Sequence, residues 1–213
     1  MTSDLDLRER RELCDLFDEV GPDAPTLCGD WTTADLAAHL VVRERDPRSG
    51  PGILLGGRFE RYTESLMARE LERHGFAGVV QRVRTGPPVG PFRIRPIGHA
   101  ANIVEFFVHH EDVRRARGDR IRADRTDLDE ELWGMLKRLL PLMVRKARIP
   151  NVELIVERPD GARRSAGSGE AVVMSGAVQD LVLELYGRSS VVEVEVSGDR
   201  SAVARVTSAT FGI

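Results

Sequence analysis

The spacing of apolar residues changes near residue 150, and this change limits the chain to a fold with two kinds of secondary structure. Before that point, apolar residues recur every three to four positions, as they do on one face of an α-helix. Beyond it, short valine-rich runs alternate with glycine and proline turn signals, a pattern typical of strands. The 213 residues therefore predict a helical part, residues 1–150, followed by a small α+β part, residues 151–213.

The helical part is expected to contain four long helices packed as a bundle, with a shorter excursion between the second helix and the later ones. The second helix has the clearest start signal, because Thr32 at the N-cap is followed three residues later by Asp35, which completes a capping box. Glycine and proline residues between Ser49 and Gly57 predict a loop. The helices and the excursion are expected over residues 4–20, 32–46, 59–83, 99–116 and 127–143.

The small C-terminal part is expected to begin with a β-hairpin, whose turn is Arg158-Pro159-Asp160-Gly161. Ser175 can then cap a helix that bears regularly spaced apolar residues and ends at Gly187. Two further runs alternate like paired strands around Ser197-Gly198-Asp199. The first hairpin strand and these two runs cover residues 152–157, 191–196 and 202–206.

The composition excludes several classes of protein. Hydrophobic residues at 41% and charged residues at 31% are typical of an ordinary globular protein, not of a disordered or membrane-spanning chain. With a net charge of -3, the chain has no overall positive field to attract nucleic acid or an anionic membrane. Among its 31 cations only Lys137 and Lys146 are lysine, and we attribute this arginine bias to a GC-rich genome. Two cysteines and the lack of a secretory signal pattern predict a cytoplasmic protein.

Three polar residues on two expected helices form a candidate metal site. Glu105 and His109 are four residues apart, so their side chains project from one helix face, about one turn apart. His39 lies close to the apolar stripe of the helix over residues 32–46, which is expected to face the bundle interior. If the two helices are neighbours, two imidazoles and a carboxylate converge, a set that suits zinc, with nickel, iron or manganese as alternatives. Three protein ligands leave a coordination position open for water or substrate.

The same residues also fit a simpler interpretation, in which the histidines are hydrogen-bonded core residues and the Glu–His pair is a surface pair. The E-x-x-x-H spacing is not the H-E-x-x-H of metalloproteases, so no peptidase activity is expected. Asp112 and Arg188 are the candidate catalytic residues: Asp112 either orients His109 or is surface-solvated, and Arg188 either binds an anionic substrate or pairs with helix carbonyls. His110 points off the ligand face. Cys28 is either a reactive thiol at a helix N-terminus or an inert buried cysteine, and the second is expected.

The helices that carry these candidate ligands also carry longer motifs. Residues 27–40 have the sequence LCGDWTTADLAAHL, and residues 105–116 have the sequence EFFVHHEDVRRA, with Gly118 two positions later. These segments resemble the gW(T/S)xxDLxAHL and ExxxHxxDvrxAxG motifs of the mycothiol-dependent maleylpyruvate isomerase family, within the DinB-like (YfiT-like) metalloprotein superfamily. Residues 175–188 are similar to that family's small C-terminal domain. The resemblance implies an α+β fold, in which a DinB-like four-helix bundle precedes a small α+β domain, and divalent-metal ligands at His39, Glu105 and His109.

The resemblance implies a metal-binding protein, with zinc as the expected metal, that acts as a mycothiol-dependent transferase or isomerase. A free thiol with a pKa of about 8.5 is mostly protonated at neutral pH, and metal coordination converts it into a thiolate that can attack a small electrophile. The expected partners are therefore a small-molecule thiol and an electrophilic substrate, and a homodimer is one expected assembly. A non-enzymatic metal-binding module and a metal-dependent hydrolase stay open as alternatives. Residues 59–83 match no family motif, so maleylpyruvate is not carried over as the substrate.

Overall fold

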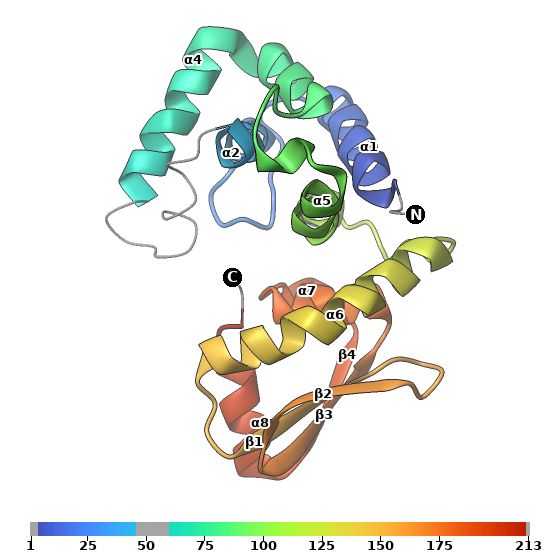
Figure 1. Cartoon of the computed structure of the whole chain (residues 1–213). Coiled ribbons are helices and arrows are strands. Elements are labelled where there is room, and N and C mark those ends of the chain that lie inside the picture. The colour runs from blue at the N-terminus through green and yellow to red at the C-terminus, as the bar shows by residue number, and fades with distance from the viewer. Residues whose placement is uncertain (1–3, 46–59, 212–213) are drawn as a thin grey trace. The chain divides into compact units, whose positions relative to one another are not determined.

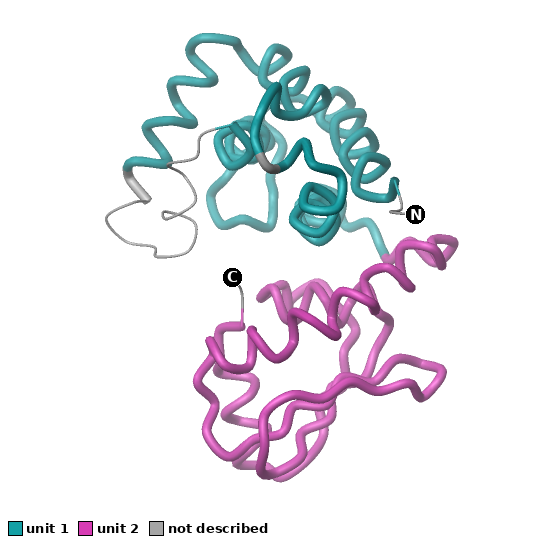
Figure 2. The backbone as a smooth tube through the Cα atoms, viewed as in Figure 1, with its two compact units in different colours: residues 1–120 teal, residues 121–213 magenta. Residues whose placement is uncertain are grey.

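The chain consists of two compact units, residues 1–120 and residues 121–213 (Figure 2). The structure is a computed structural model that describes residues 4–45 and 60–211, so the loop expected between Ser49 and Gly57 lies outside the described residues, as does Phe59. Within the described ranges, every helix is too short or too polar to cross a lipid bilayer. Each unit has its own set of buried apolar residues.

In the described residues of the first unit, 4–45 and 60–120, four long helices pack together (Figure 1). Helix α2 packs against α4, and α1 packs against both α4 and α5. A short 3-10 helix, η2 (Pro91–Arg93), precedes α5. The helices are α1 (Leu5–Val20), α2 (Thr33–Arg45), α4 (Glu60–Thr85) and α5 (Arg95–Ala116). Their core includes Leu13, Phe17, Leu36, Leu40, Val79, Val80, Val83, Phe106 and Val113.

Local sequence signals account for the ends of these helices. The capping box predicted at the start of α2 is confirmed: the Thr32 backbone N–H donates to Asp35 Oδ2 at 3.0 Å, and the Asp35 N–H donates to Thr32 Oγ1 at 3.4 Å. The excursion expected over residues 59–83 is helix α4, which is interrupted at Gly75 with φ 62° and ψ 170°. That positive φ favours glycine, and it turns the second half of α4 away from the axis of the first.

The second unit is a four-stranded sheet with three helices (Figure 1). The strand order is β2-β1-β3-β4, with β1 antiparallel to β2 and parallel to β3, and β3 antiparallel to β4. Side chains alternate along β1, so that Val152, Leu154 and Val156 are buried. The elements are α6 (Thr126–Ala147), β1 (Val152–Glu157), β2 (Arg163–Ser168), β3 (Glu170–Gly176), α7 (Val178–Leu185), η3 (Ser189–Val191), β4 (Val194–Gly198) and α8 (Arg200–Thr207).

The structure corrects three expectations about this region. Residues 202–206 are not a strand but part of α8, because Asp199 caps that helix by accepting from the N–H groups of Ser201 and Ala202. Ser175 does not cap α7, since it lies in β3 and the N-cap is Ala177. Strand β3 itself was not expected, because its pairing with β1 is between segments that are not joined by a tight turn.

Helix α6 belongs to the second unit, so the compact units divide after Arg120 and not at residue 150. It packs against β2 and α7, and the Arg164 side chain of β2 donates from Nε to the Trp133 carbonyl of α6 at 3.0 Å. The fourth member of the N-terminal bundle is therefore α4, in place of the helix expected over residues 127–143. An apolar stripe shows that a helix is covered, but it does not identify the partner that covers it.

Candidate metal centre

His39, Glu105 and His109 lie together in the first unit, at the contact between α2 and α5. Glu105 Oε1 is 3.4 Å from His39 Nε2 and 3.4 Å from His109 Nε2. The two imidazole rings are 5.3 Å apart between centroids, and one ligand atom from each of the three residues lies within 4.8 Å of the others. Glu105 and His109 share a face of α5 because they are one helical turn apart. The structure thus brings together the three residues that sequence spacing singled out.

Arg43, one turn after His39 on α2, fixes the position of Glu105. Its Nε is 3.0 Å from Glu105 Oε1, its NH1 group donates to Asn102 Oδ1 at 2.8 Å, and its NH2 group donates to the Ala101 carbonyl at 2.7 Å. Burial by itself raises the pKa of the Glu105 carboxyl, but the Arg43 guanidinium and the two histidines outweigh it and hold that pKa well below its usual value. Glu105 is therefore an anion at neutral pH.

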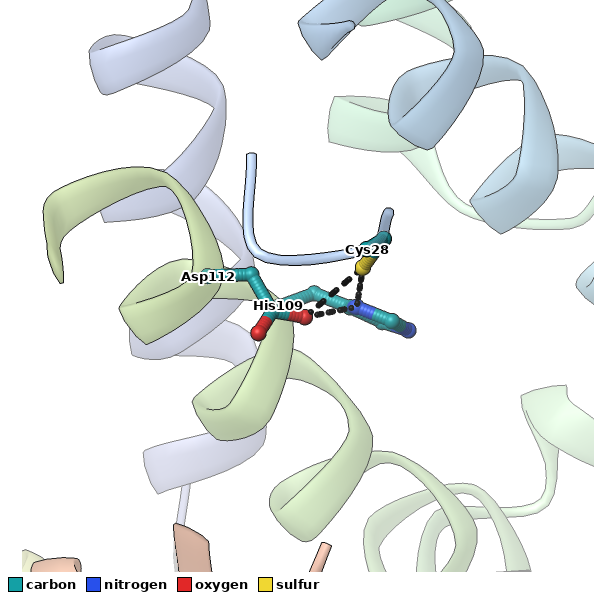
Figure 3. A group of neighbouring side chains, drawn as sticks. All are labelled: Cys28, His109 and Asp112. Atoms are coloured by element: carbon teal, nitrogen blue, oxygen red, sulfur yellow. Dashed lines mark hydrogen bonds and ion pairs between the residues drawn. The ribbon is translucent and has the colours of Figure 1, made fainter. Parts of the chain in front are cut away.

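His109 uses its two ring nitrogens for different partners. Nε2 faces Glu105, whereas Nδ1 donates to Asp112 Oδ2 at 2.9 Å (Figure 3). Asp112 is fully buried, and its Oδ2 also accepts from the Cys28 thiol at 3.0 Å. A carboxylate on one imidazole nitrogen fixes the tautomer and orients the other nitrogen, which is how metal-binding histidines are commonly held.

The two histidines differ in how readily they carry a proton. Burial is the largest influence on His39 and lowers the pKa of its imidazole, which is neutral at pH 7 with an unshared electron pair on the ring. Burial also acts to lower the pKa of His109, but hydrogen bonds to Asp112, Cys28 and Glu105 outweigh it, and that pKa lies well above its usual value. A cation that binds at Nε2 of His109 would therefore displace a proton.

The donor set is suited to a borderline divalent cation. Two imidazole nitrogens and one carboxylate oxygen are ligands of zinc sites that keep an open coordination position. The three side chains are 12%, 22% and 12% exposed, so the cluster lies near the surface of the unit and is not sealed in the core. A second group, Glu9, Glu12 and His110, also holds its ligand atoms within 4.8 Å. In that group Glu9 is fully buried, and its Oε2 lies 3.0 Å from His110 Nδ1, which describes a hydrogen-bonded pair inside the α1–α5 contact.

A chain of buried polar contacts connects the cluster to α1. Arg10 donates to both carboxylate oxygens of Glu44 and, at 2.7 Å, to the Val83 carbonyl. Glu44 Oε1 accepts from Asn102 Nδ2 at 2.8 Å, and Asn102 Oδ1 accepts from Arg43. Each polar group in this series of contacts from Arg10 to Arg43 has a hydrogen-bond partner, as burial requires. The Glu105 carboxylate is thus connected to Arg10 of α1 through Arg43, Asn102 and Glu44.

The remaining sequence candidates occupy other places. Asp112 lies beside His109, as one of its two interpretations expected. Arg188 belongs to the second unit and donates from NH1 to the Tyr186 carbonyl at 2.5 Å, directly after α7. Cys28 is half-buried and bonded to Asp112, so it is not an isolated core cysteine. The sequence reasoning missed Arg43, although its position four residues after His39 on the same helix face was a usable signal.

No protein-family model matches this chain, and no curated protein matches it in sequence. Its fold is similar to that of a solved structure described as the crystal structure of the mycothiol-dependent maleylpyruvate isomerase. The TM-score is 0.57 at 16% sequence identity, and the similarity covers 91% of this chain and 90% of that chain. The helical N-terminal part and the C-terminal α+β part fit a DinB-like fold, which confirms the fold class expected from the sequence.

Proposed function

We propose that His39, Glu105 and His109 bind a divalent metal, zinc in the first instance, and that the protein is a mycothiol-dependent transferase or isomerase. The observation that supports the proposal is the convergence of these three donors, within 4.8 Å of one another, in a fold similar to that of a mycothiol-dependent isomerase. The donor set suits zinc because zinc is a borderline cation that binds both imidazole nitrogen and carboxylate oxygen. Membership of the mycothiol-dependent maleylpyruvate isomerase family is part of this proposal.

The side chains of this chain have distinct roles in the proposal. His39 and His109 would supply nitrogen ligands and Glu105 an anionic oxygen ligand. Asp112 would hold His109 so that its Nε2 faces the metal, and Arg43 would hold the Glu105 carboxylate through the Nε contact of 3.0 Å. When bound, the metal would lower the pKa of a coordinated thiol and so make a thiolate available near neutral pH.

The reaction follows from the chemistry of a thiolate. Addition of the thiolate to one carbon of an electrophilic carbon–carbon double bond forms the carbon–sulfur bond and breaks the π bond, whose electron pair moves onto the neighbouring electron-withdrawing group of the substrate. Uptake of the proton released by the thiol then gives a conjugate. If rotation about the resulting single bond and loss of the thiolate come first, the double bond re-forms and the product is an isomer. Both outcomes need only the thiol and the substrate, so we propose transferase or isomerase activity as one class.

Metal analysis of the purified protein tests whether His39, Glu105 and His109 bind a divalent metal. We expect about one zinc per chain in the wild type and strong loss of metal in His39→Ala, Glu105→Ala and His109→Ala. His74→Ala is a matched control, because His74 lies on α4 next to Glu70, 3.8 Å away, and belongs to none of the groups of candidate ligands. Metal retained by all three site variants at the wild-type level would reject the site.

Titration calorimetry with mycothiol tests whether the protein depends on this thiol. We expect the metal-loaded protein to bind mycothiol and the metal-stripped protein to bind it at least about tenfold more weakly. Metal binding without any mycothiol binding would contradict the thiol-dependent enzyme and favour a non-enzymatic metal-binding module. Turnover of a substrate without added thiol would instead identify a metal-dependent hydrolase.

A further inference from the structure

A pocket of about 290 Å³ lies in the first unit between α2 and α4, and its walls carry a surplus of positive charge. On α4 the lining residues Leu66, Arg69, Glu70 and Arg73 follow the i, i+3, i+4, i+7 spacing of a single helix face. The opposite wall comes from α2, where Val41 and Val42 are buried and form an apolar part of the lining. The complete lining is Val41, Val42, Arg45, Leu66, Arg69, Glu70, Arg73 and Arg82.

The kink in α4 brings a further arginine to this pocket. Arg82 and Glu70 are twelve residues apart, which would separate them by about 18 Å along a straight helix. Because α4 is interrupted at Gly75, Arg82 instead returns to the pocket, and its Nε lies 3.0 Å from Glu70 Oε2. Glu70 is also 3.8 Å from His74 Nε2, so the acidic side chain in the lining already faces two basic groups.

Four arginines and one glutamate line the pocket, which leaves three positive charges without a matching acidic group in the lining. Arg45 donates to the carbonyls of Arg82, at 3.0 Å, and Gly86, at 2.5 Å, so it is held by backbone oxygens. Arg69 and Arg73 are exposed, and neither forms an ion pair with any residue in the described part of the chain. Among the described residues, no acidic side chain therefore neutralises these two guanidinium groups at the pocket wall.

The electrostatics of the pocket favour an anion. Burial is the largest influence on Arg45 and lowers the pKa of its guanidinium, and the positive charge of Arg82 lowers it further. Like charges held close together raise the free energy of the unliganded pocket, and a bound anion would relieve that repulsion. Guanidinium groups bind carboxylate and phosphate oxygens with paired hydrogen bonds, which makes an oxyanion the matching ligand class.

We propose that this pocket binds a small oxyanion with two negative charges, either a phosphate group or a dicarboxylate. The volume of about 290 Å³ is at the lower end for ligand pockets, so it suits a small metabolite and not a nucleotide or a polymer. The site is distinct from the candidate metal centre. His39 and Arg43 contact residues of α5, whereas Val41, Val42 and Arg45 line the pocket with residues of α4.

Titration calorimetry with three probes at constant ionic strength tests the proposal. Inorganic phosphate and succinate carry two charges at pH 8, and acetate carries one. We expect saturable binding of at least one dianion with a Kd of about 1 mM, the affinity that two charge-assisted contacts can supply, and no saturation with acetate. Phosphate that binds more tightly than succinate identifies a phosphate group as the ligand, and the reverse order identifies a dicarboxylate.

Two double variants locate the binding. In Arg69→Gln/Arg73→Gln we expect the Kd of the preferred dianion to rise at least about tenfold. The matched control is Arg11→Gln/Arg93→Gln, which removes the same charge from positions of the same unit outside the pocket, and its Kd should stay within about twofold of the wild type. Equal weakening in both variants would show a general charge effect and overturn the proposal. So would an unchanged Kd in Arg69→Gln/Arg73→Gln, or a wild-type protein that binds neither dianion.

Discussion

Replacing Arg43 with methionine is the most direct test of the polar contacts that hold Glu105. The substitution keeps a long, flexible side chain but removes the guanidinium and its contacts with Glu105 Oε1 at 3.0 Å, Asn102 Oδ1 at 2.8 Å and the Ala101 carbonyl at 2.7 Å. Arg43 is only 12% exposed, so water cannot freely replace all three contacts. The carboxylate of Glu105 would lose its nearest full positive charge.

The magnitude follows from the number and burial of these contacts. Hydrogen bonds to a charged group contribute about 1.5–3 kcal/mol each, and three of them give an upper bound of about 9 kcal/mol. The actual loss is smaller, because Glu105 is 22% exposed and keeps both histidines at 3.4 Å. Removal of one partner of a buried ion pair usually costs about 3–5 kcal/mol. We expect the free energy of unfolding of Arg43→Met to fall by about 3 kcal/mol.

Urea unfolding followed by circular dichroism measures this change, with Arg43→Lys as the matched variant. Lysine keeps the positive charge but lacks the planar fork, so we expect a smaller loss of about 1–2 kcal/mol. Under the proposed function, zinc affinity should also fall about 10- to 100-fold in Arg43→Met and less in Arg43→Lys, because the metal ligand is less well oriented. An Arg43→Met protein with the wild-type urea midpoint and slope would refute the reasoning, since it would show that burial of these contacts contributes no stability.

Two further predictions concern other parts of the chain. Gly134 is an exposed position inside α6, where an added Cβ would meet nothing within 4 Å, so Gly134→Ala should stabilise the protein by about 0.5–1 kcal/mol; a lower thermal midpoint would contradict this. Asp6 is buried at the α1–α5 contact and, although burial raises the pKa of its carboxyl, Arg95 and His99 outweigh this and lower it. A lowered pKa gives stability that is present above the unfolded-state value of about 3.9 and is lost as the pH falls through the folded-state value. Asp6→Asn should therefore be less stable by about 1–3 kcal/mol at pH 7 and lose less stability than the wild type between pH 5 and pH 2 in urea unfolding; parallel pH profiles would show that Asp6 does not titrate as described.

The sequence-based expectations succeeded where the deciding interactions are local. The capping box at Thr32 and Asp35 and the hairpin turn before β2 involve residues within a few positions of each other. The four-residue spacing of Glu105 and His109 places both side chains on one face of α5 for the same reason. In each case, backbone geometry over one turn of chain determines the outcome, and a single sequence contains that information.

The errors in the C-terminal part arose where two local interpretations compete. Residues 202–206 alternate like a strand, but Ala202 and Val206 are also one helical turn apart and both are buried in α8. The Asp199 side chain caps the first turn and so stabilises the helix over the strand. Strand β3 depends on its parallel pairing with β1, and no local signal shows a pairing between strands that are not connected by a turn.

The sequence by itself determined the two kinds of secondary structure, most helix positions, and the placement of Glu105 and His109 on one face of α5. Only the tertiary structure decided that α6 packs against β2 and α7, that His39 approaches the α5 pair, and that Arg43 contacts Glu105. The physical reason is that periodicity defines which face of a helix is apolar. The apolar faces of many other helices or strands could cover that face equally well. The choice of partner depends on packing and polar contacts between residues such as Arg43 and Glu105, 62 positions apart in the sequence.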